Sequence, residues 1–173
     1  DDAGVGWMTP PTATLQDAVA RDRAAALLMI ALDDLHPEHE PRLAVIGPRF
    51  VLVGVRDLDA LKSVRLDEAV RDELAGDGFL GTFVFTPGGY SADADFAARM
   101  FFAAQGARED PATGSANTAF ARYLRERGST GDVVVEQGFE IDRPSRLYLD
   151  LGNGTDPIRV GGRVQHFLTG TVL

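Results

Sequence analysis

Short apolar and β-branched runs recur along the chain, and they predict β-strands. They lie at residues 5–8, 43–55 with a break at Gly47-Pro48, 81–86, 94–104, 133–136, 146–149, 158–160 and 164–167. The last two runs flank Gly161 and Gly162, which predict a two-residue hairpin turn between them. Strands are therefore expected along most of the chain, with a concentration in the second half.

Helical periodicity is strongest from Ser115 to Arg127. Five apolar side chains of this segment fall on one stripe: Ala116, Ala119, Phe120, Tyr123 and Leu124. Gly128 is placed to end the helix. Residues 16–31 contain a run with helical composition, and two short helices are expected at residues 58–64 and 66–74. Strands on both sides of one strong helix predict a mixed α+β domain rather than a regular alternation of strands and helices.

The amino-acid composition indicates a globular domain and argues against a membrane protein or a nucleic-acid-binding protein. The 173 residues are 45% hydrophobic and 25% charged, as expected for one globular domain. The apolar run at residues 27–32 is stopped by two aspartates and is too short to span a membrane. No cysteine is present, which excludes disulfides and thiol catalysis, and a net charge of −9 with one lysine argues against nucleic acid binding. We expect a cytoplasmic protein without membrane or nucleic acid partners.

A turn from a strand into the strong helix carries the candidate chemistry. Pro111 holds Asp110 in an extended conformation, and the helix begins a few residues later. Thr113, Gly114 and Ser115 then place a glycine and a hydroxyl where the first helical turn has unpaired N–H groups, which is a favourable seat for a carboxylate. Asp110 would lie beside that seat and could exchange a proton with a bound acid. One acid beside one anion seat indicates proton transfer on a small amino or carboxylic acid.

The same residues have a simpler interpretation. Thr113 or Ser115 would cap the helix and Asp110 would complement its dipole, an arrangement that contributes about 1 kcal/mol in many helices without function. Taken alone, the residue types favour this simpler interpretation. Glu109 precedes Asp110 in an extended segment and should therefore point to the opposite face, so the two carboxylates are not expected to form a catalytic pair.

Three weaker motifs are interpreted as structural. Residues 76–81 fit G-x-G-x-x-G, but they follow a predicted helix and precede a predicted strand, which is the reverse of a dinucleotide-binding unit. His36 and His39 flank a proline without a third ligand, so an exposed loop is favoured over a metal site. Ser115 is not in a G-x-S-x-G elbow, which leaves His166 as a structural histidine.

Residues 99–116, RMFFAAQGAREDPATGSA, resemble the signature R-x-F-x-P-x-x-G-x-x-E-D-P-x-T-G-S-A of the phenazine-biosynthesis PhzF-like family. Ala104 stands where the family usually has proline, a departure that concerns the local turn. Further agreement follows in the family's order, at Gln137-Gly138, Arg143-Pro144-Ser145, Val160-Gly161-Gly162 and Gly170. The resemblance extends from about Val5 to the C-terminus.

This resemblance implies a fold similar to diaminopimelate epimerase, in which two like domains each wrap a curved sheet around a central helix and the active site lies between them. Residues 1–173 would be the C-terminal domain, with residues 1–15 as the interdomain connector and the N-terminal domain absent. By the same resemblance, Asp110 is a catalytic acid, and Thr113, Gly114 and Ser115 bind the substrate carboxylate. The family's general-base glutamate would lie in the N-terminal domain.

The sequence thus leads to a first hypothesis of a cofactor-independent and metal-independent isomerase or epimerase. Its substrate would be a small amino or carboxylic acid, such as one similar to dihydro-hydroxyanthranilate. The chain would be inactive without its N-terminal domain, and the resemblance implies a homodimer. The alternatives are a non-catalytic small-acid-binding domain or subunit that lacks the general base, and an unrelated α+β interaction module.

Overall fold

A single mixed sheet organises the chain. The computed structural model describes residues 4–76, 78, 80–102, 108–165, 167 and 169–170. Within them, ten strands join in the order β1-β10-β9-β8-β6-β5-β4-β3-β2, with β7 paired to β6. The strands are β1 (Val5–Met8), β2 (Thr14–Ala18), β3 (Arg42–Val45), β4 (Arg49–Gly54), β5 (Leu80–Pro87), β6 (Phe96–Phe101), β7 (Glu109–Asp110), β8 (Asp132–Gln137), β9 (Ser145–Asp150) and β10 (Arg159–Arg163).

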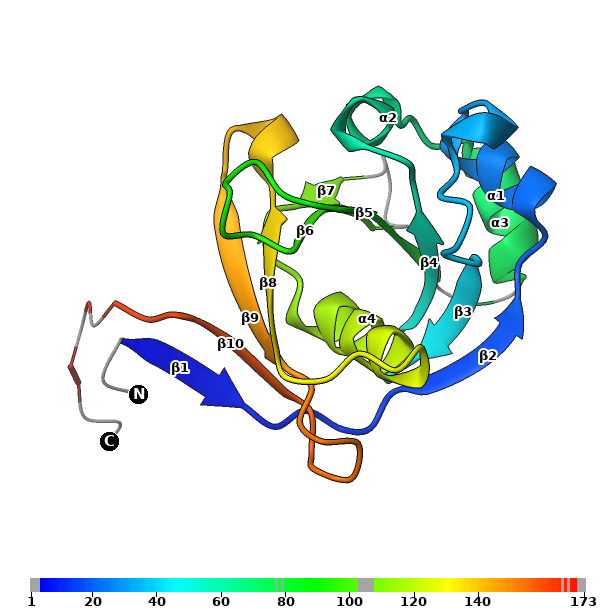
Figure 1. Ribbon diagram of the computed structural model, residues 1–173. Coiled ribbons are helices and arrows are strands. Elements are labelled where there is room, and N and C mark those ends of the chain that lie inside the picture. Colours follow the sequence, from blue (N-terminus) through cyan, green and yellow to red (C-terminus); the bar gives the residue numbers. More distant parts are fainter. Residues whose placement is uncertain are drawn as a thin grey trace.

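Two parallel crossovers place the helices on opposite faces of the sheet. The helices are α1 (Arg21–Leu28), α2 (Leu58–Ser63), α3 (Glu68–Ala75) and α4 (Gly114–Glu126), with single 3-10 turns at Leu32–Asp34 and Phe139–Ile141. Strands β4 and β5 are parallel and are connected through α2 and α3, whereas β6 and β8 are parallel and are connected through β7 and α4. The sheet curves around α4, and the other three helices lie outside the curve (Figure 1). The predicted α+β fold, a mixed curved sheet around one central helix, is confirmed.

The two sides of the curved sheet have separate cores. On the inner side, the Phe120 ring of α4 packs against Phe83, Phe85 and Phe96, with ring centroids 5.4, 4.4 and 5.1 Å away. On the outer side, Val84 joins the apolar residues of α1 to α3. Successive residues of β5 are buried because both faces of the strand are covered. The inner core fixes α4, and with it the turn at its N-terminus.

The helix expected within residues 16–31 is confirmed as α1, which starts at Arg21 after the end of β2. Two other predictions about secondary structure are wrong. Gly161 and Gly162 do not form a hairpin turn, because both lie inside β10 and pair with β1 and β9. Gly161 is needed for packing, since a Cβ there would lie 2.9 Å from the Trp7 ring. The predicted last strand at 164–167 is also absent from the described residues of that range.

Some predictions fall outside the described residues, namely those for Asp77 and Phe79 of the G-x-G-x-x-G segment, Ala104 and His166. Among the residues that the structure describes, none of the helices combines the length and apolar character needed to cross a bilayer.

Candidate active site

The turn between β7 and α4 is held at both ends. Asp110 pairs with Met100 of β6 as the last residue of β7, and α4 begins four residues later at Gly114. Thr113 is the residue before the helix, in an extended conformation, and its side chain does not cap the helix. The first-turn N–H groups of α4, where the sequence predicts an anion seat, therefore receive no cap from the Thr113 side chain.

The Thr113 hydroxyl contacts Asp110 instead of the helix. Its Oγ1 donates to Asp110 Oδ2 at 2.5 Å and accepts from Gln137 Nε2 at 3.1 Å. Thr113 is 4% exposed, whereas Asp110 is half-buried. In the described part of the chain, the second carboxylate oxygen, Oδ1, has no hydrogen-bond partner. Asp110 thus has one oxygen held by the protein and one available.

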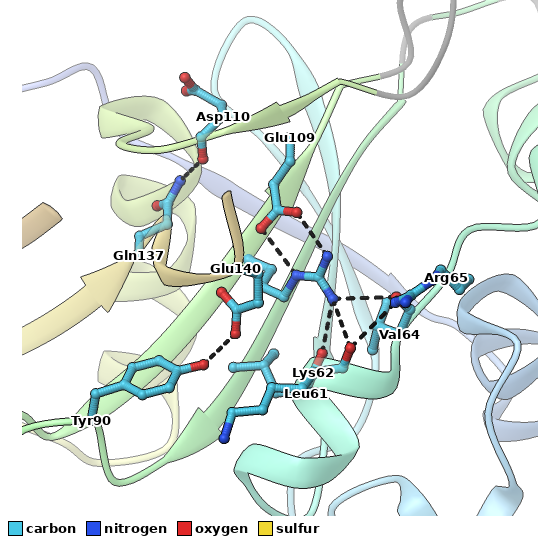
Figure 2. A network of polar contacts seen from close by, with 10 residues as sticks. Leu61, Lys62, Val64, Arg65, Tyr90, Glu109, Asp110, Gln137 and Glu140 are labelled. Atoms are coloured by element: carbon cyan, nitrogen blue, oxygen red, sulfur yellow. Dashed lines mark hydrogen bonds and ion pairs between the residues drawn. The ribbon is translucent and has the colours of Figure 1, made fainter. Parts of the chain in front are cut away.

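Gln137 ends β8 and connects three parts of the turn. Its Nε2 also donates to the Asp110 carbonyl oxygen at 2.6 Å (Figure 2), and its Oε1 accepts from Asn117 Nδ2 at 3.0 Å and from the Thr113 N–H at 3.4 Å. Asn117, in the second turn of α4, donates to the Thr113 carbonyl oxygen as well, at 2.9 Å. Gln137 and Asn117 are 1% and 0% exposed. The turn is therefore fixed by a buried set of polar contacts.

Gly138 brings the following segment into contact with the turn. It has a φ of +85°, and a Cβ at this position would lie 2.4 Å from the Arg143 carbonyl oxygen and 2.9 Å from Pro111 Cα. Only glycine fits this combination of backbone conformation and close approach. The Gln137-Gly138 pair, noted in the sequence only through the family resemblance, is the partner of the candidate turn.

An open pocket of about 720 Å³ borders the turn. Ala112 and Gly114 form one side, and the facing side is built from three strands and the residue before β9: Gly6, Met8, Pro144, Ser145, Arg146, Leu147, Val160, Gly161, Gly162 and Arg163. A Cβ on Gly162 would meet nothing within 4 Å, and one on Gly114 would meet only Met8 Cε at 3.7 Å. Glycines thus leave the pocket open and expose backbone to a ligand.

Glu109 lies on the other side of β7. Its carboxylate accepts from Arg99 Nε at 3.0 Å and from Arg99 Nη2 at 2.7 Å, and both side chains are less than a tenth exposed. Figure 2 shows the side chains of Glu109 and Asp110 pointing in opposite directions. Arg99 also donates through Nη1 to the carbonyl oxygens of Leu61 and Val64. The prediction that the two neighbouring carboxylates do not form a pair is confirmed.

The two histidines weighed as metal ligands form an aromatic cluster. His36 and His39 have ring centroids 4.5 Å apart, and His39 packs against Phe85 and Tyr123. Burial, and to a smaller extent the charge of the nearby His36, lowers the pKa of His39 to about 4. Within the described ranges, no group of three or more metal-ligating side chains is found. Of the segment expected to be exposed, Pro37 and Glu38 are exposed, whereas His39 is half-buried.

The structure brings Asp110, Thr113 and Gly114 together around one turn. Ser115 follows in the first turn of α4, half-buried, and does not form part of the pocket wall. The residue that sequence reasoning missed as part of the turn is Gln137, 27 residues from Asp110 in the chain. Its only signal was the Gln-Gly match to the family.

A single mixed sheet curved around one central helix places the chain among the α+β proteins. A family model described as phenazine biosynthesis-like protein, PhzC-PhzF, matches residues 3–170. The chain belongs to this family, and the resemblance seen in the sequence is confirmed.

Similar proteins agree on the family and the fold. The chain is 33% identical to an uncharacterised isomerase of Mesorhizobium japonicum over 67% of this chain and 42% of the relative. It is 34% identical to the trans-2,3-dihydro-3-hydroxyanthranilate isomerase of Pseudomonas aeruginosa over 72% of this chain and 44% of the relative. The chain thus spans less than half the length of these curated relatives.

Solved structures give the same result. A PhzF-family phenazine biosynthesis protein of Bacillus anthracis superposes with a TM-score of 0.75 at 21% identity, over 91% of this chain and 57% of that chain. A predicted epimerase of Pseudomonas aeruginosa superposes with a TM-score of 0.73 at 27% identity, over 98% and 58%. The predicted diaminopimelate epimerase-like fold is confirmed.

Proposed function

We propose that the protein carrying this chain is a cofactor-independent isomerase that moves a proton on a small amino or carboxylic acid. The observation that carries this proposal is the environment of Asp110. Thr113 holds one carboxylate oxygen at 2.5 Å, and the other has no hydrogen-bond partner in the described part of the chain. A carboxylate oriented in this way, two residues before Ala112 of the pocket wall, is suited to general acid/base catalysis.

The substrate carboxylate is proposed to bind at the start of α4. The N–H groups of Gly114 and Ser115 belong to a first helical turn without a side-chain cap, and the helix dipole favours an anion there. Gly114 also forms part of the pocket wall, so a ligand in the pocket reaches the backbone. Thr113 is proposed to contribute to this site through Asp110, since its hydroxyl is already engaged.

A second acid/base group is proposed to come from a further domain. Glu109 is committed to Arg99, and none of the described residues that line the pocket is acidic. By the family resemblance, the missing group is a glutamate of the N-terminal domain. The chain spans 42% and 44% of the two curated relatives, which supports this division of the site. The isolated chain is expected to be inactive.

Solvent deuterium exchange tests the proposal. The longer protein would be incubated in D₂O with trans-2,3-dihydro-3-hydroxyanthranilate, the substrate in the name of one relative, and with a panel of small aromatic and cyclic amino acids. We expect deuterium incorporation into one of them, and a loss of at least about 10²-fold in Asp110→Asn with unchanged folding. Unchanged exchange in this variant would remove Asp110 from the mechanism.

A second variant tests the pocket. Gly162→Val places a side chain in open space, so it should fill the pocket without disturbing the strand. We expect its substrate affinity to fall at least about 10-fold, since a filled pocket excludes the ligand. Gly78→Val, outside the pocket wall, is the control. Equal affinity in Gly162→Val and the wild type would place the substrate elsewhere.

The second candidate function is a non-catalytic domain that binds a small acid. It is supported by the lack of an acidic residue among the described residues of the pocket wall. It predicts that the longer protein binds a ligand, that Gly162→Val weakens this binding, and that no deuterium enters any bound ligand.

A further inference from the structure

We infer that Gln137 is a positioning residue, which directs the Thr113 hydroxyl at Asp110 and thereby leaves Oδ1 as the carboxylate oxygen that exchanges the proton. The inference rests on the proposed role of Asp110. Gln137 is 1% exposed, and its amide is engaged by Asp110, Thr113 and Asn117, so it acts through Thr113 and Asp110 rather than on a ligand.

Backbone groups fix the orientation of the Gln137 side-chain amide. The Thr113 N–H can only donate a hydrogen bond, and it lies 3.4 Å from one end of the amide. The Asp110 carbonyl can only accept, and it lies 2.6 Å from the other end. The first end must therefore be the oxygen and the second the nitrogen. Asn117 Nδ2, 3.0 Å from the oxygen, agrees with this assignment.

The orientation of the amide decides the direction of the Thr113 hydroxyl. Gln137 Nε2 donates to Thr113 Oγ1 at 3.1 Å, which uses a lone pair of the hydroxyl oxygen. The hydroxyl hydrogen is then directed to Asp110 Oδ2, at 2.5 Å, a separation typical of a hydroxyl donating to a carboxylate. Oδ2 is occupied by the protein, and Oδ1 stays available to a substrate.

Burial and close packing keep this chain of contacts in place. Thr113 and Gln137 are almost fully buried, so water cannot easily replace either contact. Gly138, the next residue, packs closely on Pro111 and ties the end of β8 to the same turn. A carboxylate that lost this support would move, and a misplacement of about 1 Å can reduce a rate by about 10²-fold.

Three variants of the longer protein test the inference through deuterium exchange. Gln137→Met keeps the length of the side chain without hydrogen bonds, Thr113→Val removes the hydroxyl, and Thr113→Ser retains it. We expect the first two to lower kcat by about 10- to 100-fold with KM changed by less than about threefold, because orientation rather than binding is lost. Thr113→Ser should stay within about threefold of the wild type.

The double variant Gln137→Met/Thr113→Val separates a chain of contacts from independent effects. If Gln137 acts through Thr113, the loss in kcat is smaller than the product of the two single losses. A full product of the two losses, an effect on KM alone, or an equal loss in Thr113→Ser would overturn the inference. Thermal unfolding followed by circular dichroism confirms that each variant is folded.

NMR provides a readout that needs no substrate. Three-bond couplings report the side-chain rotamers of Asp110 and Thr113 in the wild type and in Gln137→Met. We expect one rotamer for each residue in the wild type and averaged rotamers in the variant. Unchanged couplings would overturn the inference even if exchange is found. If the wild type exchanges no probe, the proposed function fails, whereas averaged couplings in the variant would still support the role of Gln137 in orienting Asp110.

Discussion

Glu109 and Asp110 are adjacent carboxylates with opposite environments. The side chain of Glu109 is 7% exposed, forms a two-point ion pair with Arg99 and faces the outer side of the sheet. Asp110 is half-buried, accepts from the Thr113 hydroxyl in the described part of the chain and faces the inner side, where α4 begins. The alternation of a strand, with a period of two residues, separates them. Proximity in the sequence therefore does not indicate shared chemistry.

The difference also shows how the turn is held. On the Glu109 side, charge fixes β7 to the end of α2, since Arg99 bridges Glu109 and the Leu61 carbonyl oxygen. On the Asp110 side, neutral hydrogen bonds from Gln137 and the close approach of Gly138 perform this task. The catalytic candidate is thereby supported without a counter-charge that would occupy its carboxylate.

The largest expected effect comes from breaking the ion pair. Glu109→Gln leaves Arg99 buried and unpaired, so we expect the free energy of unfolding to fall by about 4 kcal/mol. Asp110→Asn should change it by less than about 1 kcal/mol, since the amide oxygen still accepts from Thr113. Urea denaturation measures both.

The control for this prediction is an exposed ion pair. Arg122 and Glu126 are four residues apart on α4, with side chains 33% and 37% exposed. Glu126→Gln should cost only about 0.5 kcal/mol. If Glu109→Gln costs no more than this control, the Glu109 side of the turn is not held by charge.

An intermediate effect is expected from the other side of the turn. Gly138→Ala combines a positive φ with a contact of 2.4 Å to the Arg143 carbonyl oxygen, so we expect a loss of about 3 kcal/mol. Gly128 is the matched control, since its φ is +89° and its Cβ would meet nothing within 4 Å. Gly128→Ala should cost about 1 kcal/mol, the backbone strain alone. Equal losses in the two variants would show that close packing at Pro111 does not support the turn.

Local sequence patterns predicted those features that do not depend on contacts between distant parts of the chain. The stripe of α4 and the alternation at Glu109-Asp110 depend only on neighbouring residues, and both are confirmed. Residues 16–18 adjoin a run with helical composition, but they belong to β2, which is a strand because it pairs with β3. The hydrogen bond from Gln137 to Asp110 joins residues 27 positions apart, and no local period encodes such a contact.

The Gly161-Gly162 pair shows a second reason for failure. Two adjacent glycines favour a tight turn when only local conformation is considered. Here each glycine has a role in the folded chain that the sequence does not reveal. Gly161 leaves room for the Trp7 ring, and Gly162 faces the open pocket. Asp110 and Gly114 were found because turn chemistry is local, whereas their support by Gln137 required the folded chain.

The smallest expected effect extends the comparison to a buried group without a counter-charge. His39 has a folded-state pKa of about 4, lowered from 6.5 mainly by burial. Between these values the unfolded chain binds more protons, so stability is complete above pH 6.5 and is lost as the pH falls towards 4. Because His39 is only half-buried, we expect a loss of about 1 kcal/mol by pH 4.5.

This pH dependence can be assigned by comparing two histidine variants. In His39→Gln the loss attributed to burial of the imidazole should disappear from urea midpoints measured between pH 7 and 4.5. His36→Gln should retain most of it, because the charge of His36 is a smaller cause of the shift than burial. An unchanged pH profile in His39→Gln would mean that other groups govern acid unfolding. A flat pH profile in His39→Gln would complete the contrast with Glu109, whose buried side chain is paired with Arg99.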